Sequence, residues 1–183
     1  MKYTFFLVLI ALLAIACQPP ASNNASNAPA AAKADWDGYV DHFLNDYFAA
    51  NPTTAVYQGK HEYDGKFPDW SDEGIKKEIA RLKSEREKAA AFRDEDLDER
   101  QRFERDYLIA QIDKELFWSE TVDYPHINPN FYSDALDPDV YVSRPYAPLE
   151  QRIMSFTTYA KNVPTALTQL KTTLKTPMPK ALV

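Results

Sequence analysis

The sequence predicts an all-α protein, and three observations support this fold class. The chain of 183 residues contains only four glycines. Few of its segments alternate between apolar and polar residues, which is the pattern of half-buried strands. Apolar residues instead recur three and four positions apart along several stretches, and this spacing places them on one face of a helix.

The first 34 residues are predicted to lie outside the globular part. Residues 1–16 combine Lys2, an uncharged apolar stretch and small residues, as in a secretory signal peptide. This stretch is too short to span a bilayer, which needs about 20 residues. The sequence Ala-Ile-Ala-Cys ending at Cys17 resembles a bacterial lipobox, so we expect lipid on Cys17 to anchor the chain in the membrane. Residues 17–34 lack aromatic and branched apolar side chains, and they are predicted to form a disordered tether.

Composition restricts the function of the remaining chain. The formal net charge is −6, and no stripe of lysine and arginine is present, which argues against a nucleic-acid partner. Cys17 is the only cysteine, so lipidation leaves no thiol for a disulfide, a nucleophile or a metal site. Residues 35–183 are long enough for one helical domain.

The first helix is predicted over 36–50. Asp35 is placed to cap its N-terminus, and the dipeptide beginning at Asn51 ends it because the next residue is proline. A short helical turn over 52–58 follows, with Gly59 as its C-terminal cap. The apolar face of 36–50 is formed by Trp36, Tyr39, Val40, Phe43, Leu44, Tyr47 and Phe48.

Two longer helices are predicted in the middle of the chain. Ser71 caps a highly charged helix that reaches about Phe92, and an acidic turn over 94–99 follows it. The next helix covers about 98–119. Its inward-facing residues are expected to be Phe103, Tyr107, Leu108, Ile112, Leu116 and Phe117.

Residues 121–147 are predicted to form a long loop rich in proline and aromatic residues. Loops of this length are uncommon in compact domains, and the aromatic content predicts an ordered segment laid on another surface, in this chain or in a partner. Two further helices are expected over about 148–161 and 164–175. Pro164 suits the first position of the second.

No catalytic residue and no metal-binding set is predicted in this chain. The sequence beginning His61-Glu62 starts like the zinc motif H-E-x-x-H, but Gly65 stands where the second histidine is required. The run Asp94, Asp96 and Asp98 lacks the glycine and the final glutamate of a calcium-binding loop. His42 is expected to pack or to form a surface hydrogen bond.

Six short segments, taken in order, resemble the N-terminal part of the bacterial domain-of-unknown-function family 885. Each segment is weakly specific alone, whereas their order is more informative. They are FLNDYFAANP at 43–52, GKHEYD at 59–64, PD at 68–69, RDY at 105–107, RPYAPL at 144–149 with Arg152, and VPTAL at 163–167.

This resemblance implies a larger helical fold similar to zinc metallopeptidases, often secreted or lipid-anchored. In that family the H-E-x-x-H motif lies downstream of the region matched here, and its zinc activates a water while its glutamate acts as general base. We therefore expect residues 35–183 to be a truncated scaffold segment that is inactive alone. Zinc is expected only in a full-length member. The implied partners are the missing C-terminal half of the same protein and a peptide substrate.

The resemblance also suggests cleft-lining residues. His61 and Asp64 belong to a recurring element that faces the substrate cleft, and Arg144 and Tyr146 line it as well. Under the alternative interpretation, His61 bonds to Asp64 or to a backbone carbonyl and fixes a turn. Arg144 then pairs with a carboxylate, and Tyr146 contributes aromatic packing.

A second hypothesis is a complete helical binding or adaptor lipoprotein that uses 121–147 as its contact surface. Exposed apolar area separates the two hypotheses, because an independent module hides its apolar faces. Both predict a protein of the bacterial cell envelope. Gln18 stands where an aspartate would resemble an inner-membrane retention signal, which favours the outer membrane, with the domain facing the periplasm.

Overall fold

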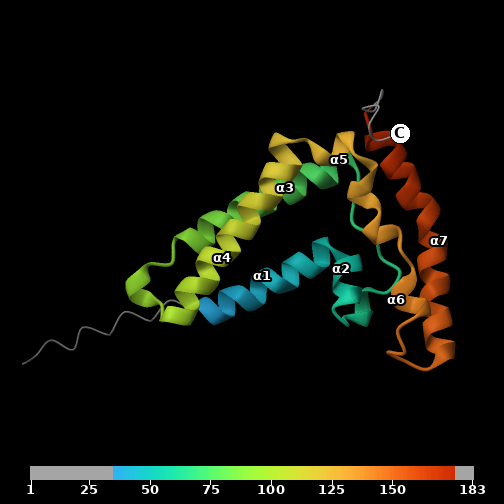
Figure 1. The fold of residues 1–183 in the computed structure, drawn as a ribbon, viewed down its shortest axis with the longest axis horizontal. Helices are drawn as coiled ribbons and strands as arrows, with labels where there is room; N and C mark the ends of the chain where they lie inside the picture. Colours follow the sequence, from blue (N-terminus) through green and yellow to red (C-terminus); the bar gives the residue numbers. More distant parts are fainter. Residues whose placement is uncertain (1–34, 176–183) are drawn as a thin grey trace, which may run out of the picture. The chain divides into compact units, whose positions relative to one another are not determined.

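The computed structural model describes residues 35–175, which form helices joined by short connections (Figure 1). No strand occurs in this range, so the predicted all-α fold class is confirmed. Across the same residues, no helix has both the length and the apolar character needed to cross a membrane. The signal peptide 1–16, Cys17 and the tether 17–34 lie outside the described residues.

The first two helices match their predictions. α1 (Trp36–Ala50) begins where the Asp35 carboxylate accepts the backbone N–H of Gly38 at 2.9 Å, and this bond satisfies one of the free donors at the helix start. Asn51 ends it by donating its backbone N–H to the carbonyl of Tyr47. α2 (Pro52–Tyr57) follows directly, and Gly59 then adopts a φ of +86°.

α3 (Asp72–Ala90) and α4 (Glu99–Leu116) form an antiparallel pair, and α1 packs against both. Ser71 caps α3 as predicted, its Oγ accepting from Gly74, and Asp98 and Gln101 form a reciprocal capping box at the start of α4, which was not predicted. The acidic turn is a short 3₁₀ helix, η2 (Asp94–Asp96). The three helices share two apolar clusters, built on Trp36, Ala89 and Leu97 and on Phe43, Leu82 and Ile112.

The predicted inward face of α4 is partly wrong. Ile112 is buried, and Leu108 and Leu116 pack against the shared clusters, but Phe103 is 71% exposed and Tyr107 is 58% exposed. Adjacent helix positions point about 100° apart, so Phe103 and Tyr107 form a second stripe beside the first. Phe117, at the start of the π-helical turn η3 (Phe117–Thr121), is also exposed.

The segment predicted as a loop is a chain of short helices. They are η3, α5 (Tyr124–Ile127), η4 (Pro129–Tyr132), η5 (Asp134–Leu136) and α6 (Asp139–Val142). Prolines stand in the first turns of α5 and η4, where a missing N–H costs little. The surface that this segment covers belongs to the same chain. Tyr132 packs with Trp70 and Ala166, and Tyr141 packs with Val56 and Tyr159.

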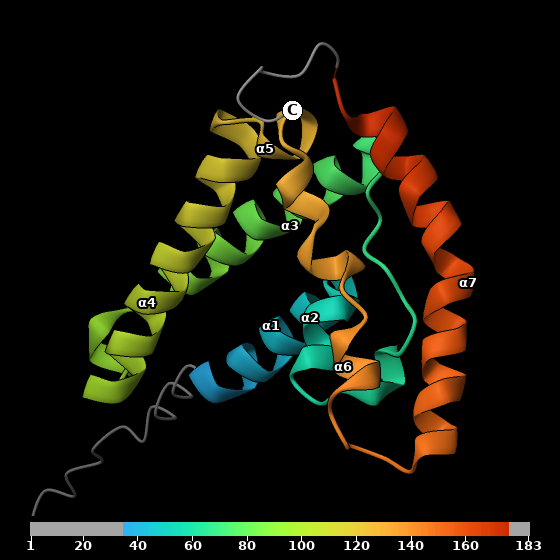
Figure 2. The same cartoon turned by 45° about the vertical axis from the view of Figure 1, so that its right-hand side comes forward.

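α7 (Leu149–Thr173) is one continuous helix, where two were predicted. Pro164 lies inside it, although proline there removes a backbone hydrogen bond. Packing on both sides of the proline holds the helix together, because Tyr159 and Ala166 are both buried. Figure 2 shows α6 beside α7, and α7 carries side chains into two of the core clusters.

Candidate functional site

Three of the four predicted cleft residues come together in one cluster. The imidazole of His61, in the 3₁₀ helix η1 (His61–Tyr63), stacks on the ring of Tyr146 with centroids 3.6 Å apart and planes 9° apart. His61 Nδ1 lies 3.1 Å from Asp64 Oδ1. The hydroxyl of Tyr146 donates to Asp64 Oδ2 at 3.4 Å. The bond to Asp64 is the one expected under the alternative interpretation, whereas the stacking of His61 on Tyr146 was not predicted.

The fourth residue, Arg144, lies apart from this cluster. Its Nη1 donates to the carbonyl of Tyr57 at 3.0 Å, and its guanidinium lies 5.0 Å from the centre of the Tyr57 ring. The partner is thus a helix C-terminus and an aromatic face rather than the carboxylate suggested by the sequence. A positive charge is favourable at this end of α2. Arg144 positions the segment that carries Tyr146.

Besides His61, Asp64 and Tyr146, the cluster contains Ser155, which the sequence did not indicate. The hydroxyl of Ser155, on α7, donates to Asp64 Oδ2 at 2.6 Å. Ser155 and Asp64 are 91 positions apart, and no local pattern marked the serine. Because this hydroxyl bonds to the carboxylate and not to the imidazole, the cluster is not a serine–histidine nucleophile pair.

The backbone behind the cluster is fixed by buried contacts. Gly65 donates its N–H to the hydroxyl oxygen of Tyr141 at 2.9 Å, and Asn162 Nδ2 donates to the carbonyl of Gly65 at 2.8 Å. Burial raises the pKa of Tyr141 to about 12, so its hydroxyl stays neutral at physiological pH. Arg152 Nη1 and Nε donate to three carbonyls in the 141–147 segment, which attaches that segment to α7.

This arrangement defines the chemistry available at His61. A carboxylate only accepts hydrogen bonds, so a neutral imidazole facing Asp64 carries its proton on Nδ1. The lone pair is then on Nε2, which has no hydrogen-bond partner among residues 35–175. The side chain of His61 is 25% exposed, whereas that of Asp64 is 12% exposed. His61 therefore presents an oriented acceptor, or base, at a partly open surface.

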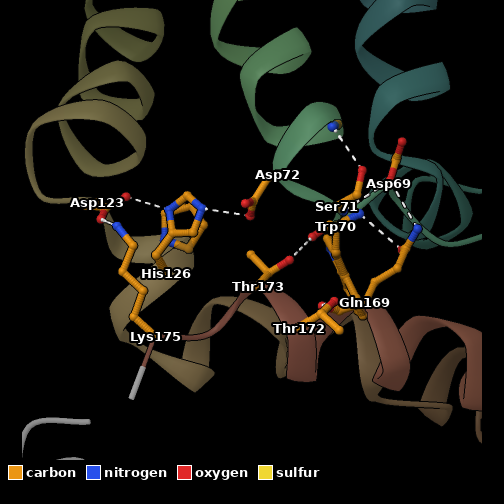
Figure 3. Close-up of polar contacts among 12 residues, drawn as sticks. Asp69, Trp70, Ser71, Asp72, Asp123, His126, Gln169, Thr172, Thr173 and Lys175 are labelled. Atoms are coloured by element: carbon orange, nitrogen blue, oxygen red, sulfur yellow. Dashed lines mark hydrogen bonds and ion pairs between the residues drawn. The ribbon is translucent and has the colours of Figure 1, made fainter. Parts of the chain in front are cut away.

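The other two histidines have different surroundings. His126 Nδ1 lies 2.5 Å from Asp123, its Nε2 lies 3.2 Å from Asp72, and Lys175 donates to Asp123 at 2.6 Å (Figure 3). Both ring nitrogens thus bond within the chain and connect α5, the start of α3 and the residues after α7. Burial opposes ionisation of Asp123, but hydrogen bonds from Lys175 and His126 outweigh it and lower the pKa of that carboxyl. His42 is largely exposed beside Asp46.

The zinc expected for a full-length family member does not fit these residues. Within the described range 35–175, no three histidine, cysteine, aspartate or glutamate side chains are placed to hold a metal ion. His61 and His126 each face carboxylates through hydrogen bonds rather than converging on a common point.

Comparison with known proteins identifies related sequences and a related fold. Residues 52–183 match the profile of the family described as "Bacterial protein of unknown function (DUF885)". No curated protein sequence matches the chain. A solved structure, described as that of "a putative lipoprotein of unknown function from Shewanella oneidensis", matches 78% of this chain with a TM-score of 0.69 and 20% sequence identity. The match covers 26% of that protein, so this chain spans about a quarter of its length.

Proposed function

The chain belongs to the bacterial family DUF885, and we propose that it is the N-terminal scaffold segment of a lipid-anchored envelope protein resembling zinc metallopeptidases. In this proposal the segment forms one wall of a peptide-binding cleft, and the metal ligands come from residues outside the described part. The chain alone is inactive. Lipid on Cys17 holds the protein at the outer membrane, facing the periplasm.

The observation that carries this proposal is an exposed apolar face on α7. Leu149, Ile153 and Phe156 recur at helical spacing on one side of it, and Met154 lies beside them. Exposed apolar patches of this kind mark surfaces that another structure covers. We propose that a further part of the same polypeptide covers this face. The Shewanella oneidensis chain, of which the present chain spans 26%, supports this choice of occupant.

In the completed cleft, His61 is the residue that contacts substrate. Asp64, Ser155 and Tyr146 restrict its ring to one orientation, and Nε2 is positioned to accept a hydrogen bond from a peptide N–H. Such an arrangement reduces the ordering cost on binding, because the imidazole is already fixed by stacking and by the carboxylate.

The adaptor hypothesis has weaker support. It used the aromatic residues of 121–147 as a contact surface, but Tyr132 and Tyr141 are buried against this chain. Phe131 and Val142 remain exposed in that segment. Other exposed apolar side chains lie outside that segment, on α4, in η3 and on α7.

The size and location of the native product test the scaffold proposal. An antibody against residues 35–60 should detect a membrane-bound polypeptide several-fold larger than the 20.9 kDa of this chain. Cys17→Ser should move the product out of the membrane fraction, because the anchor is the acylated thiol. A native band near 20.9 kDa would contradict the scaffold role, and unchanged membrane attachment of the serine variant would contradict the anchor.

His61→Ala in the native full-length protein tests the cleft assignment. We expect kcat/KM for hydrolysis of a mixed peptide pool to fall about tenfold, the equivalent of about 1.4 kcal/mol and so of one lost hydrogen bond to substrate. Zinc content should not change, because His61 is not proposed as a ligand. His42→Ala, at an exposed position on α1, is the matched control. Equal activity of both variants, with the fold intact, would remove His61 from the cleft.

A further inference from the structure

The side of α4 and η3 that faces away from the core carries a row of exposed, mostly aromatic side chains. They recur three and four positions apart, and we refer to them as the outer stripe: Phe103, Tyr107, Ala110, Lys114, Phe117 and Trp118. Phe103 stacks with Tyr107, ring centroids 6.2 Å apart, and Phe117 meets Trp118 edge to face at 5.5 Å. The outer stripe is about 22 Å long at about 1.5 Å per residue. A continuous exposed surface of this kind indicates a contact with another body.

The start of the outer stripe lies close to the point where the chain leads to its predicted membrane anchor. Asp35 is the first described residue, and α1 begins directly after it. Trp36 Nε1 donates to Glu104 Oε2 at 3.0 Å, which places the starts of α1 and α4 side by side (Figure 1). Glu104 follows Phe103 in the sequence, so the predicted tether 17–34 joins the domain near Phe103. A flexible chain of that length spans about 20–25 Å, which is similar to the length of the outer stripe.

The side chains of the outer stripe have the chemistry of a membrane–water boundary. Tyr107 and Trp118 each combine an apolar ring with a polar O–H or N–H group, and such residues concentrate at membrane interfaces. Phe103 and Phe117 supply purely apolar surface. The opposite side of α4, which includes Ile112, packs on α1 and α3. The outer stripe is therefore similar to the apolar face of a helix that lies in the plane of a membrane surface.

The charges beside the outer stripe favour neutral lipid over anionic lipid. Lys114 lies 3.2 Å from Glu115, and Arg100 donates to Glu104 at 2.6 Å, so both cations are paired with carboxylates. Asp106 is exposed on the edge of the stripe and adds negative charge. Electrostatic attraction to anionic headgroups needs an excess of lysine and arginine, which this face lacks. Insertion of aromatic rings is the contact that remains.

We propose that the outer stripe rests on the membrane surface, with its aromatic rings inserted among the lipid headgroups. This inference rests on the lipid anchor at Cys17 proposed above. The anchor provides the attachment, and the outer stripe fixes the orientation of the domain. Because the tether keeps the domain near the bilayer, the effective concentration of membrane surface is high, and a contact too weak to bind alone is populated.

Fluorescence quenching of Trp118 tests this contact in the acylated full chain. Trp118 is 45% exposed, whereas Trp36 and Trp70 are 1% and 3% exposed, so a quencher in the lipid reaches Trp118 first. In phosphatidylcholine vesicles brominated near the headgroup end of the acyl chains, we expect weaker emission than in unbrominated vesicles. Trp118→Phe should abolish this difference. Partial replacement of the lipid by anionic phosphatidylglycerol should not deepen the quenching, and deeper quenching would overturn the assignment of a neutral surface.

A double variant places the contact on the outer stripe. Phe103→Gln combined with Tyr107→Gln should lower the ratio of docked to undocked chain about tenfold, the effect of losing about 60 Å² of buried apolar surface. Val142→Gln, at an exposed position on α6, is the matched control and should leave the quenching unchanged. Equal quenching of the double variant and the unmodified chain would contradict the proposal.

The remaining outcomes separate docking from anchoring. A vesicle-bound, acylated chain whose Trp118 is not quenched would overturn the docking and leave the anchor intact. Absence of lipid on Cys17, read by mass spectrometry of the purified chain, would overturn the anchor and the docking together. If Trp118 were shielded from aqueous acrylamide but not quenched by the brominated lipid, the outer stripe would be covered by protein, either a second copy or a further part of the polypeptide, and the docking would be wrong.

Discussion

Tyr132→Ala is expected to lower the free energy of unfolding by about 3–5 kcal/mol, the usual range for truncating a buried aromatic side chain. The side chain of Tyr132 is 0% exposed. Its ring meets Trp70 edge to face, with centroids 4.9 Å apart, and meets Phe131 in the same way at 5.0 Å. Truncation therefore leaves a cavity beneath η4 and also removes the hydroxyl that donates to the carbonyl of Pro125 at 2.6 Å.

Urea unfolding of residues 35–183 measures this loss of stability. Two further variants show how much of the loss comes from the hydroxyl and how much from burial of the ring. Tyr132→Phe keeps the ring and loses only the hydroxyl, so it should cost about 1–3 kcal/mol by leaving the carbonyl of Pro125 buried and unpaired. Tyr107→Ala, at a 58% exposed site on α4, should change stability by no more than about 1 kcal/mol. If Tyr132→Ala and Tyr107→Ala had equal costs, the 129–142 segment would not be packed on this chain.

The elements that were predicted well from sequence are those defined by local signals. α1, α3 and α4 each begin at a residue whose side chain bonds to the backbone within the next few positions: Asp35, Ser71 and Asp98. A capping residue followed by an apolar 3.6-residue period requires no knowledge of the tertiary structure. These helices were therefore located to within about three residues at each end.

The errors lie where tertiary contacts decide between local possibilities. Residues 98–119 carry two apolar stripes, and only packing against α1 and α3 determines that Leu108 faces inward while Tyr107 does not. At Pro164, local preference favours a new helix, but burial of Tyr159 and Ala166 on either side stabilises one continuous helix. The short helices of 124–142 are likewise stabilised by contacts with distant residues such as Trp70.

The residues of the candidate site likewise include some that the sequence indicates and others that only the fold brings together. His61 and Asp64 were identified through one short motif of the family resemblance, and their separation of three positions allows their bond. Tyr146 was reached through the family resemblance, and its stacking on His61 is a long-range contact. Ser155 had no signal at all, because a serine on a helix is unremarkable until the fold brings it to Asp64.

Gly65→Ala is the second substitution with a large expected effect, about 2–5 kcal/mol of stability. Gly65 has a φ of +76°, a left-handed conformation that costs an L-residue about 1–2 kcal/mol. A Cβ here would lie 2.7 Å from Thr158 Cγ2 and 2.9 Å from the backbone nitrogen of Tyr159. Because the second contact is to helix backbone, α7 itself must shift, and such overpacking adds about 1–3 kcal/mol.

Gly59→Ala provides the matched control, because it separates backbone strain from collision. Gly59 has a similar φ of +86°, but nothing lies within 4 Å of an added Cβ. Urea unfolding should therefore show the cost of strain alone, about 1–2 kcal/mol, and the difference between the two variants is the cost of displacing α7. That displacement also moves Ser155 away from Asp64, so Gly65→Ala should alter the NMR chemical shifts of the His61 ring while Gly59→Ala leaves them unchanged. Equal losses of stability, with an undisturbed His61 in both variants, would show that η1 and α7 are not packed as closely as the His61 cluster requires.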